Sequence, residues 1–175
     1  MKKIEILDCT LRDGSYVLDF NFSLLDTYLI TKVLFESGVN YVEIGHGLGL
    51  GASKKKNIKN SLHSDDEYIK ISNLAKQKNE NKIGCFCFSN NVTNKNFHFA
   101  KKSGLDFIRF AYEKNNFIKI KKDIEYCKKV GLEVHLNLIK TYQYSLPDLR
   151  SILKKINKLR IDYFYIVDSS GGMTS

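Results

Sequence analysis

The sequence predicts an α/β fold built around a parallel sheet, and three observations support this prediction. Six short apolar runs alternate strictly with five helix-like segments along the 175 residues. A unit of a glycine, an apolar residue and an acid or amide precedes three of these runs, at Gly38, Gly104 and Gly131. No linker or low-complexity block divides the chain, so we expect one domain over residues 1–175. Strict alternation is typical of parallel strands joined by helical crossovers.

The strands are predicted where apolar residues are densest, and the helices where capping residues precede a helix-like pattern. We expect strands near residues 4–8, 40–45, 82–88, 106–111, 132–139 and 162–167. We expect helices over residues 23–37, 64–78, 93–102, 116–129 and 146–158. Ser23 caps the first helix, a capping box at Ser64 and Glu67 opens the second, and Pro147 suits the first turn of the last. The three glycines named above are expected to end helices in the left-handed conformation.

Two topologies remain open at this point, because periodicity does not separate them. A doubly wound sheet and an incomplete eight-stranded barrel both contain six parallel strands with helical crossovers. In either one, functional side chains gather at the carboxyl ends of the strands.

Composition and charge exclude several classes of protein. Glu5 and Asp8 interrupt the apolar start of the chain, which argues against a signal peptide, and no run approaches the length of a membrane span. We therefore expect a cytoplasmic protein with no membrane partner. The net charge is +9, but the lysines are scattered and the aromatic residues occupy apolar periodic positions, which disfavours nucleic acid. Attraction of an anionic substrate is a milder interpretation. Cys85 and Cys87, on one face of a strand, are interpreted as small buried hydrophobes.

Polar side chains stand late in, or directly after, most of the predicted strands. The first strand ends at Arg12 and Asp13, where Gly14 is expected to let the backbone turn. Such a pair can hold a hard divalent cation through its carboxylate and stabilise a developing oxyanion through its guanidinium. The other polar residues at these positions are Glu43, His46, Arg109, His135, Asn137, Asp168 and Ser169.

The segment after the second strand contains G-x-G-x-x-A, a tolerated form of the dinucleotide-binding fingerprint, between Gly47 and Ala52. That fingerprint requires a helix to begin at once, so that its N-terminus can hold the pyrophosphate. Residues 53–63 are instead polar and rich in lysine, without an apolar period. We therefore expect a flexible loop over an active site.

Several motifs resemble those of a known superfamily. Asp8-x-Thr10-Leu11-Arg12-Asp13-Gly14 resembles the opening signature of the metal-dependent lyases and aldolases on the TIM barrel. Residues 42–50 are similar to the second-strand segment of that superfamily, residues 63–69 to the helix start that follows, and residues 168–173 to its sixth-strand end. The pyruvate-releasing 4-hydroxy-2-oxovalerate aldolases are the subgroup that the chain resembles most. The resemblance implies a TIM (β/α)8 barrel, of which this chain covers about six of the eight βα units.

The resemblance also implies an activity and roles for individual residues. It implies a divalent-metal-dependent aldolase that cleaves or forms a carbon–carbon bond through a pyruvate-type enolate, with a small 2-oxo acid or aldehyde as substrate. Asp13 would be a ligand of Mn²⁺ or Mg²⁺, and Arg12 would stabilise the enolate. Arg12, Asp13 and Ser169 would contact the substrate. Glu43, His46 and Arg109 would support the site.

Tyr16 is the first departure from the pattern of the resembled family. The oxovalerate aldolases carry a catalytic histidine at this position, three residues after the aspartate. A tyrosine can transfer a proton, but its usual pKa near ~10 makes it a poor base at neutral pH. A related group of aldolase-like proteins, associated with surface-polysaccharide gene clusters, is similar in having Gly/Ser-Tyr after the aspartate. Tyr16 therefore stays a candidate catalytic residue, and the substrate is open.

The second departure is the point at which the sequence stops. Relatives supply a His-x-His pair from the seventh strand to complete the metal site, whereas this sequence ends after the sixth. A complete barrel has ~250 residues. We therefore expect an incomplete metal site and little or no activity from this chain alone, which is a fragment, a degenerate product, or one part of an assembly. The alternatives are an acyl-CoA-dependent Claisen synthase and a non-catalytic barrel part that assembles with a second copy or a complementing chain.

Overall fold

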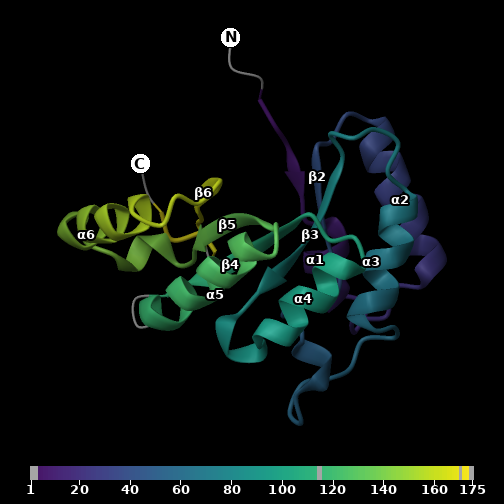
Figure 1. Cartoon of the computed structure of the whole chain (residues 1–175), viewed down its shortest axis with the longest axis horizontal. Helices are drawn as coiled ribbons and strands as arrows, with labels where there is room; N and C mark the ends of the chain where they lie inside the picture. Colours follow the sequence, from purple (N-terminus) through teal and green to yellow (C-terminus); the bar gives the residue numbers. More distant parts are fainter. Residues whose placement is uncertain (1–3, 114–115, 170, 174–175) are drawn as a thin grey trace.

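A computed structural model describes residues 4–113, 116–169 and 171–173, and these contain one sheet of six parallel strands (Figure 1). The strands are β1 (Leu7–Asp8), β2 (Tyr41–Ile44), β3 (Lys82–Cys87), β4 (Phe107–Tyr112), β5 (Glu133–Leu138) and β6 (Tyr163–Ile166). Each strand pairs with the next one in sequence. A doubly wound sheet reverses its order at a switch point, so the sequential order excludes that topology.

The sheet curves into part of a barrel. The Tyr41 hydroxyl on β2 donates to Glu133 Oε1 on β5 at 2.9 Å and lies 3.2 Å from the Tyr163 hydroxyl on β6. The Tyr163 hydroxyl in turn donates to Glu5, which precedes β1. Side chains from opposite edges of a six-stranded sheet meet in this way only if its inner face is concave. The predicted partial TIM barrel is therefore confirmed.

Five of the six α-helices in the described residues begin and end close to the predicted bounds, and the short first helix, α1, was not predicted. The helices are α1 (Thr10–Asp13), α2 (Leu24–Glu36), α3 (Asp65–Leu74), α4 (Asn94–Lys102), α5 (Phe117–Lys129) and α6 (Leu146–Asn157). The Ser23 hydroxyl caps α2, and Ser64 with Glu67 forms the predicted capping box of α3. Helix α3 ends four residues before the predicted Lys78, because Asn81 Oδ1 accepts the N–H groups of Gln77 and Lys78. No helix among the described residues is long and apolar enough to cross a membrane.

Three glycines end helices as predicted, whereas Gly14 does not turn the chain. Gly38, Gly104 and Gly131 have φ of 89°, 105° and 78°. Gly14 instead has φ of −63° and begins a 3-10 helix, η1 (Gly14–Tyr16). The prediction for Gly14 was wrong because Asp8 accepts hydrogen bonds from both the N–H and the hydroxyl of Thr10, which starts α1 directly after β1.

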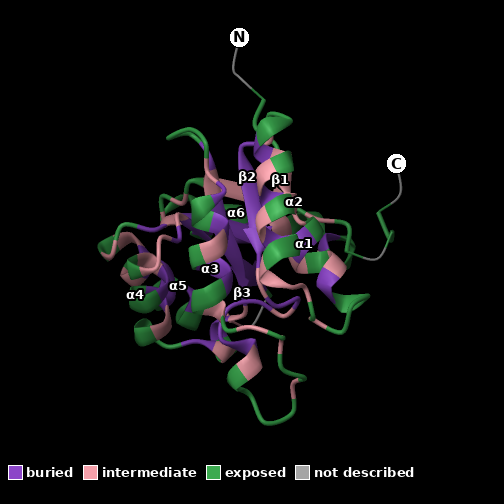
Figure 2. Cartoon of the chain, turned by 90° about the vertical axis from the view of Figure 1, so that its right-hand side faces the viewer, coloured by how far each residue is buried: buried purple, intermediate pink, exposed green. Residues whose placement is uncertain are grey.

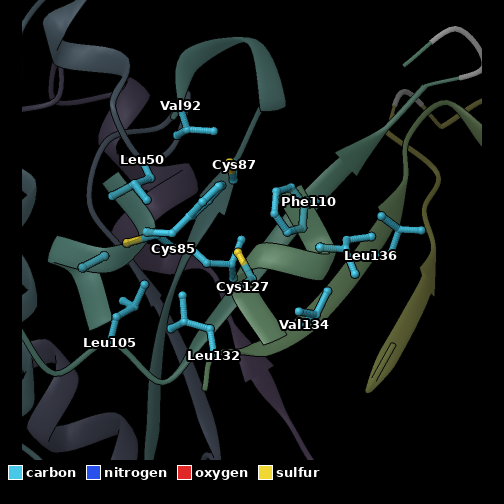
Figure 3. Packing of buried hydrophobic residues seen from close by; sticks show 14 of the residues in the cluster. Leu50, Cys85, Cys87, Val92, Leu105, Phe110, Cys127, Leu132, Val134 and Leu136 are labelled. Atoms are coloured by element: carbon cyan, nitrogen blue, oxygen red, sulfur yellow. The ribbon is translucent and has the colours of Figure 1, made fainter. Parts of the chain in front are cut away.

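The hydrophobic core lies between the convex face of the sheet and the helices, and residues of opposite character alternate along each strand. Figure 2 shows the buried strands at the centre and the exposed residues on the outer surfaces of the helices. Cys85 and Cys87 belong to the core, where burial raises the pKa of both thiols, so the prediction that they are buried hydrophobes is confirmed. Figure 3 shows them beside Phe110, Cys127 and Leu136. The inner, concave face carries the polar and aromatic side chains instead.

Candidate active site

Arg12 lies at the end of α1, where the short helix directs its guanidinium over the inner face. Its Nε donates to Glu43 Oε2 at 2.8 Å, and its Nη1 donates to Asp13 Oδ1 at 2.6 Å. Leu11, which precedes it, is buried in the core and anchors α1. The Arg12 side chain is 13% exposed and that of Asp13 is 66% exposed, so the pair joins the buried interior to the surface.

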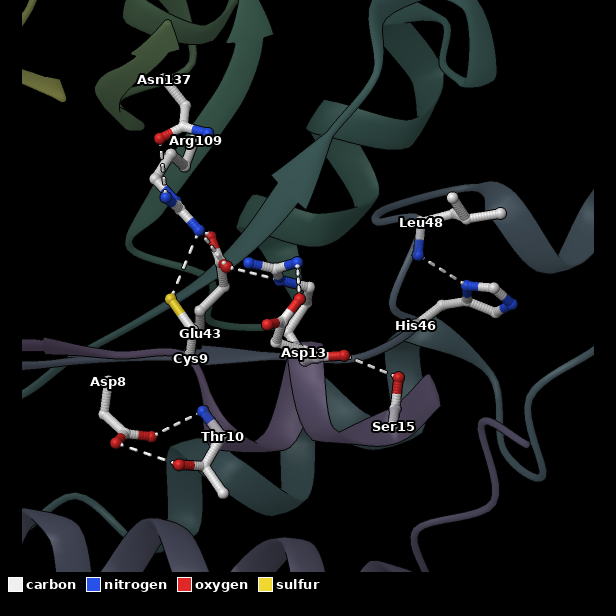
Figure 4. Close-up of polar contacts among 11 residues, drawn as sticks. Asp8, Cys9, Thr10, Asp13, Ser15, Glu43, His46, Leu48, Arg109 and Asn137 are labelled. Carbon is white, nitrogen blue, oxygen red and sulfur yellow. Dashed lines mark hydrogen bonds and ion pairs between the residues drawn. The ribbon is translucent and has the colours of Figure 1, made fainter. Parts of the chain in front are cut away.

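Arg109 on β4 holds the other side of the Glu43 carboxylate (Figure 4). Its Nε donates to Glu43 Oε1 at 2.7 Å, and its Nη2 donates to Glu43 Oε2 at 2.6 Å. The remaining donors reach Asn137 Oδ1 at 2.9 Å and Cys9 Sγ at 3.3 Å. Side chains from four segments of the chain are therefore joined by hydrogen bonds to Arg109 and Glu43. We call Cys9, Arg12, Glu43, Arg109 and Asn137 the upper cluster.

The aromatic ring of Phe86 packs under both arginines. The guanidinium carbons of Arg12 and Arg109 lie 4.8 and 5.2 Å from its centroid. A ring face attracts cations, most strongly where water is excluded. Gly84, two residues earlier on the same face of β3, leaves room for Phe107, since a Cβ there would lie 2.3 Å from the Phe107 ring.

The upper cluster contains one buried arginine, Arg109, one partly buried arginine, Arg12, and one fully buried carboxylate, Glu43, while the exposed Asp13 pairs with Arg12. Burial alone would raise the pKa of Glu43, but hydrogen bonds and charges from Arg109 and Arg12 outweigh it and hold that pKa below the usual value. The carboxylate in turn raises the pKa of both arginines, although their burial opposes this. Burial, with a smaller contribution from Glu43, raises the pKa of Cys9 to about 11, so its thiol stays protonated at neutral pH. The excess positive charge suits a developing anion.

Asp13 is the only predicted metal ligand, and its surroundings do not form a metal site. One of its oxygens accepts from Arg12. In the part of the chain that the structure describes, no group of three or more His, Cys, Asp or Glu side chains could hold a metal ion. Mg²⁺ demands near-octahedral coordination by oxygen ligands. The described residues therefore do not fit a divalent metal by themselves, and the role of Asp13 as a ligand stays a prediction.

Tyr16 follows Asp13 by one turn of η1 and is half exposed. Burial of part of its ring raises its pKa, and Asp13 adds to this rise, while the positive charge of Arg12 opposes it. A raised pKa makes the phenol a weaker acid, so the group holds its proton at neutral pH. Tyr16 therefore carries a proton that it can donate, and it is not available as a base at neutral pH.

The structure places His46 and Ser169 away from the upper cluster. His46 is buried, with Nε2 2.8 Å from the carbonyl of Lys59 and with Nδ1 accepting from the N–H of Leu48 at 3.0 Å (Figure 4). It organises the loop that follows β2. Ser169, after β6, is exposed, and its hydroxyl accepts from the N–H of Lys140 at 3.0 Å. Contact of Ser169 with a substrate stays a prediction.

The segment from Gly45 to Ala52 is packed, although the sequence predicts that it begins a flexible loop. Leu50 and Ala52 are buried, and Gly49 forms a β-bridge with Cys87 at the end of β3. A Cβ at Gly49 would lie 2.3 Å from the carbonyl oxygen of Phe86, so only glycine permits this approach. Exposed lysines begin at Lys54, and the next α-helix begins only at Asp65. Only a short 3-10 helix, η2 (Ala52–Lys54), follows the glycine-rich segment directly.

Three members of the site were not selected from the sequence, namely Cys9, Phe86 and Asn137. Asn137 was predicted to share one face of its strand with His135, but neither the inner position of that face nor its partner was predicted. Strand alternation was the available signal, because Asn137 and His135 share the face that also carries Arg109 in the neighbouring strand. Alternation does not reveal the tilt of the strands, which decides which inner residues meet.

Comparisons with known proteins agree with the fold. No family model matches the chain. It is 30% identical over 170 residues to a 4-hydroxy-2-oxovalerate aldolase from Geobacillus genomosp. 3, covering 97% of this chain and 50% of the relative. It is 27% identical over 166 residues to an oxaloacetate decarboxylase from Mycobacterium tuberculosis, covering 95% of this chain and 48% of the relative. The chain thus spans about half the length of the curated relatives it matches.

A solved structure gives the same result in three dimensions. The N-terminal domain of a candidate aldolase from Bacteroides vulgatus superposes with a TM-score of 0.76 at 27% sequence identity. The superposition covers 98% of this chain and 56% of that one.

Proposed function

We propose that this chain carries the enolate-stabilising part of a pyruvate-type lyase. The premise is that it is a distant homologue of the 4-hydroxy-2-oxovalerate aldolases and the oxaloacetate decarboxylase, and so belongs to their superfamily. Aldol cleavage of a 4-hydroxy-2-oxo acid and decarboxylation of a 2-oxo diacid both leave negative charge on the oxygen of an enolate. The proposed substrates are therefore small 2-oxo acids. The named relatives support this chemistry without deciding between the two reactions.

The upper cluster is the single observation that carries the proposal. Arg12 is partly exposed, and its Nη2 makes no hydrogen bond to another described residue, so the guanidinium retains a donor for a ligand. Glu43 fixes the orientation of the Arg12 guanidinium. Because Glu43 also pairs with Arg109, it does not neutralise the positive charge of Arg12 completely. A preorganised donor aimed at a developing oxyanion is the arrangement that contributes most to this kind of reaction.

Proton transfer is assigned to Tyr16 within the same proposal. The enolate of pyruvate must gain a proton on carbon before release, and the phenol of Tyr16 keeps a proton to give. Arg12 stabilises the phenolate that remains after transfer, and because the pKa of Tyr16 is raised above its usual value, this phenolate takes a proton back from solvent at neutral pH. Asp13, held by Arg12, adds negative charge next to the phenol and favours its protonated form.

An assay of pyruvate release tests the proposal directly, and it also tests the expectation from the sequence that this chain alone has little or no activity. The chain is incubated with oxaloacetate or with 4-hydroxy-2-oxovalerate, and pyruvate is measured by its reduction to lactate. We expect Arg12→Ala to lower kcat on the order of 10²-fold, the size associated with removal of one oxyanion donor. Arg150→Ala, on the exposed side of α6, is the matched control and should leave the rate unchanged. Equal rates for the Arg12 variant and the control would contradict the assignment.

Calorimetry tests separately whether this chain binds a divalent metal ion by itself. Members of the superfamily use a divalent metal ion, and Asp13 is the only ligand that the resemblance assigns in this chain; the described residues contain no group of three or more His, Cys, Asp or Glu side chains that could hold one. We expect calorimetry with Mn²⁺ to show no tight one-to-one binding to the isolated chain, because one exposed carboxylate binds such an ion weakly. A stoichiometric site with a dissociation constant below about 1 μM, equivalent to roughly 8 kcal/mol, would show that further ligands are present.

A second candidate function is that of an assembly partner, and the β6 edge favours it. A groove of about 510 Å³ lies between α6 and β6, with Leu153, Ile156, Ile161 and Phe164 among its lining residues. Ile166 at the end of β6 is 60% exposed. A second copy or a complementing chain that adds a strand here would cover this surface. Native mass spectrometry tests it: a dimer or larger species is expected, and a strict monomer would count against it.

A further inference from the structure

The loop between η1 and α2 contains two successive non-glycine residues in the left-handed conformation. Asp19 has φ of 53° and Phe20 has φ of 66°. This conformation is unfavourable for a bulky residue and persists only where the surroundings hold it. Here the Phe20 N–H donates to the carbonyl of Ser15 at 2.7 Å, and the Leu62 N–H donates to the carbonyl of Phe20 at 3.2 Å. The strained backbone therefore directs the Phe20 ring to a fixed position.

That position is between Tyr16 and His46. The Phe20 ring stacks on the His46 ring with centroids 3.9 Å apart and an interplanar angle of 22°. Its edge meets the Tyr16 ring at 5.2 Å and 68°. His46 is itself fixed, because Nδ1 accepts from the Leu48 N–H and Nε2 must then donate to the Lys59 carbonyl. A chain of ring contacts thus runs from a buried histidine to the half-exposed tyrosine.

Gly47 completes the surface on which Tyr16 rests. A Cβ at Gly47 would lie 2.7 and 2.8 Å from Cε2 and Cζ of Tyr16, and 2.9 Å from Cε1 of Phe20. These distances are well inside van der Waals contact, so the hydroxyl end of the Tyr16 ring lies directly on the glycine backbone. Since Tyr16 is otherwise open to solvent, little else restricts its side chain.

We propose that Phe20, His46 and Gly47 are positioning residues that hold the Tyr16 ring in place at the site. The part of this inference that concerns catalysis rests on the proposed function, in which Tyr16 transfers a proton. A proton donor must stay within hydrogen-bond reach of the reacting atom, and a displacement of about 1 Å lowers the rate on the order of 10²-fold. The stacked histidine, the strained phenylalanine and the bare glycine backbone supply that restraint. His46 therefore acts on the site through Phe20, without contact with substrate.

The substitution Gly47→Ala tests the placement without depending on activity. The backbone at Gly47 is not left-handed, and the atoms that the new methyl group would meet belong to ring ends that can move, so the variant should fold. The chain is labelled with 3-fluorotyrosine, and the Tyr16 resonance is identified by its loss in Tyr16→Phe. Gly14→Ala is the matched control, because a Cβ there meets nothing within 4 Å and its φ is −63°.

We expect the ¹⁹F resonance of Tyr16 to move in Gly47→Ala and in Phe20→Ala. It should move much less in Gly14→Ala. It should not move in Phe99→Ala, which disrupts a second histidine–phenylalanine contact, with His98, on the exposed surface of α4. A Tyr16 resonance that stays at the wild-type position in Gly47→Ala would overturn the inference.

Kinetics then separate this inference from the proposed function. In an active chain, Gly47→Ala should lower kcat on the order of 10²-fold with KM unchanged, and it should cause no further loss when added to Tyr16→Phe. A further loss in the double variant would overturn the claim that Gly47 acts through Tyr16. If the resonance moves but wild type releases no pyruvate, the placement stands and the proposed function fails.

Discussion

The concave face of the sheet holds two buried polar clusters, and they differ in charge. The upper cluster joins two arginines to one buried carboxylate, Glu43, and its only other anion is the exposed Asp13. The lower cluster is built from the first residues of four strands, Tyr41, Lys82, Glu133 and Tyr163, together with His135. In it Lys82 pairs with Glu133, and Tyr41 and His135 also donate to that carboxylate, while the Tyr163 hydroxyl lies beside that of Tyr41 and donates to Glu5.

This difference indicates that the lower cluster stabilises the fold, whereas the upper cluster can still interact with a ligand. The lower cluster balances its charges within itself, and His135 accepts from the Tyr165 hydroxyl while bonding to Glu133, so each of its members has a partner. In the upper cluster two guanidiniums share one buried carboxylate, and the second anion, Asp13, is exposed to solvent. The buried part of the cluster therefore has more positive than negative charge, at the carboxyl end of the sheet where ligands bind in such folds. A buried charge imbalance is unfavourable unless a ligand uses it, which is why we place the chemistry there.

Among the variants considered, removal of the Glu43 carboxylate from the upper cluster should lower the free energy of unfolding most. Glu43→Gln leaves the buried Arg109 guanidinium without a counterion and leaves Arg12 with only the exposed Asp13, so we expect a loss of about 3–5 kcal/mol in the free energy of unfolding. Urea denaturation measures it. Glu125→Gln on α5 is the control, because that exposed carboxylate only faces Lys121 at 3.8 Å and should matter by less than about 0.5 kcal/mol. A loss below about 1 kcal/mol for the Glu43 variant would contradict this account of the cluster.

The lower cluster should make the free energy of unfolding depend on pH, through the ionisation of Glu133. Burial would raise the pKa of Glu133, but hydrogen bonds from His135, Lys82 and Tyr41 outweigh it and lower the pKa to about 2. Because the usual value is ~4.3, the contribution is complete above about pH 5 and is lost as the pH falls toward 2. After allowance for solvent screening we expect about 2 kcal/mol.

Comparison of wild type with Glu133→Gln between pH 6 and 3 isolates this contribution. The difference in unfolding free energy between the two should shrink as the solution becomes more acidic. A difference that is constant across this range would show that Glu133 is not held in its ionised form by its neighbours.

The smallest change in stability is expected for a substitution outside both clusters, Ser169→Ala. The Ser169 hydroxyl makes one exposed hydrogen bond to Lys140, so Ser169→Ala should change stability by less than about 0.5 kcal/mol. Ser145→Ala is the comparison, since it removes the side-chain cap of α6 and should cost about 1 kcal/mol. Thermal unfolding of the two variants gives the order. If Ser169 contacts a substrate as the motif predicts, its variant should raise KM while leaving the melting temperature unchanged.

The sequence predicted the elements well because their signals are local. Ser64 and Glu67 lie three residues apart, and a helix that ends at Gly131 needs only that residue in the left-handed conformation. The prediction of a turn at Gly14 was wrong for an equally local reason, since the hydrogen bond from the Thr10 N–H to Asp8 starts a helix before Gly14. Tyr16 was selected from its motif alone, and the residues that hold it, Phe20 and Gly47, gave no sequence signal.

The site was predicted only as a set of residues at strand ends. Glu43 and Arg109 are 66 positions apart, and Cys9 and Arg109 are 100 apart, so their pairing depends on the tilt and curvature of the sheet. Alternation correctly places His135 and Asn137 on one face of their strand. It does not show that Ser169, also at a strand end, bonds to Lys140 rather than joining Arg12.

Exchange of the methyl protons of pyruvate for deuterium is the most direct test of the central claim, that the upper cluster stabilises an enolate. Exchange requires enolate formation but no aldehyde partner and no carbon–carbon bond cleavage. In D₂O, followed by proton NMR, the chain should accelerate loss of the methyl signal, and Arg12→Ala should abolish that acceleration while Arg150→Ala retains it. Exchange that is equally fast with wild type and Arg12→Ala, or no faster than in buffer alone, would contradict the claim.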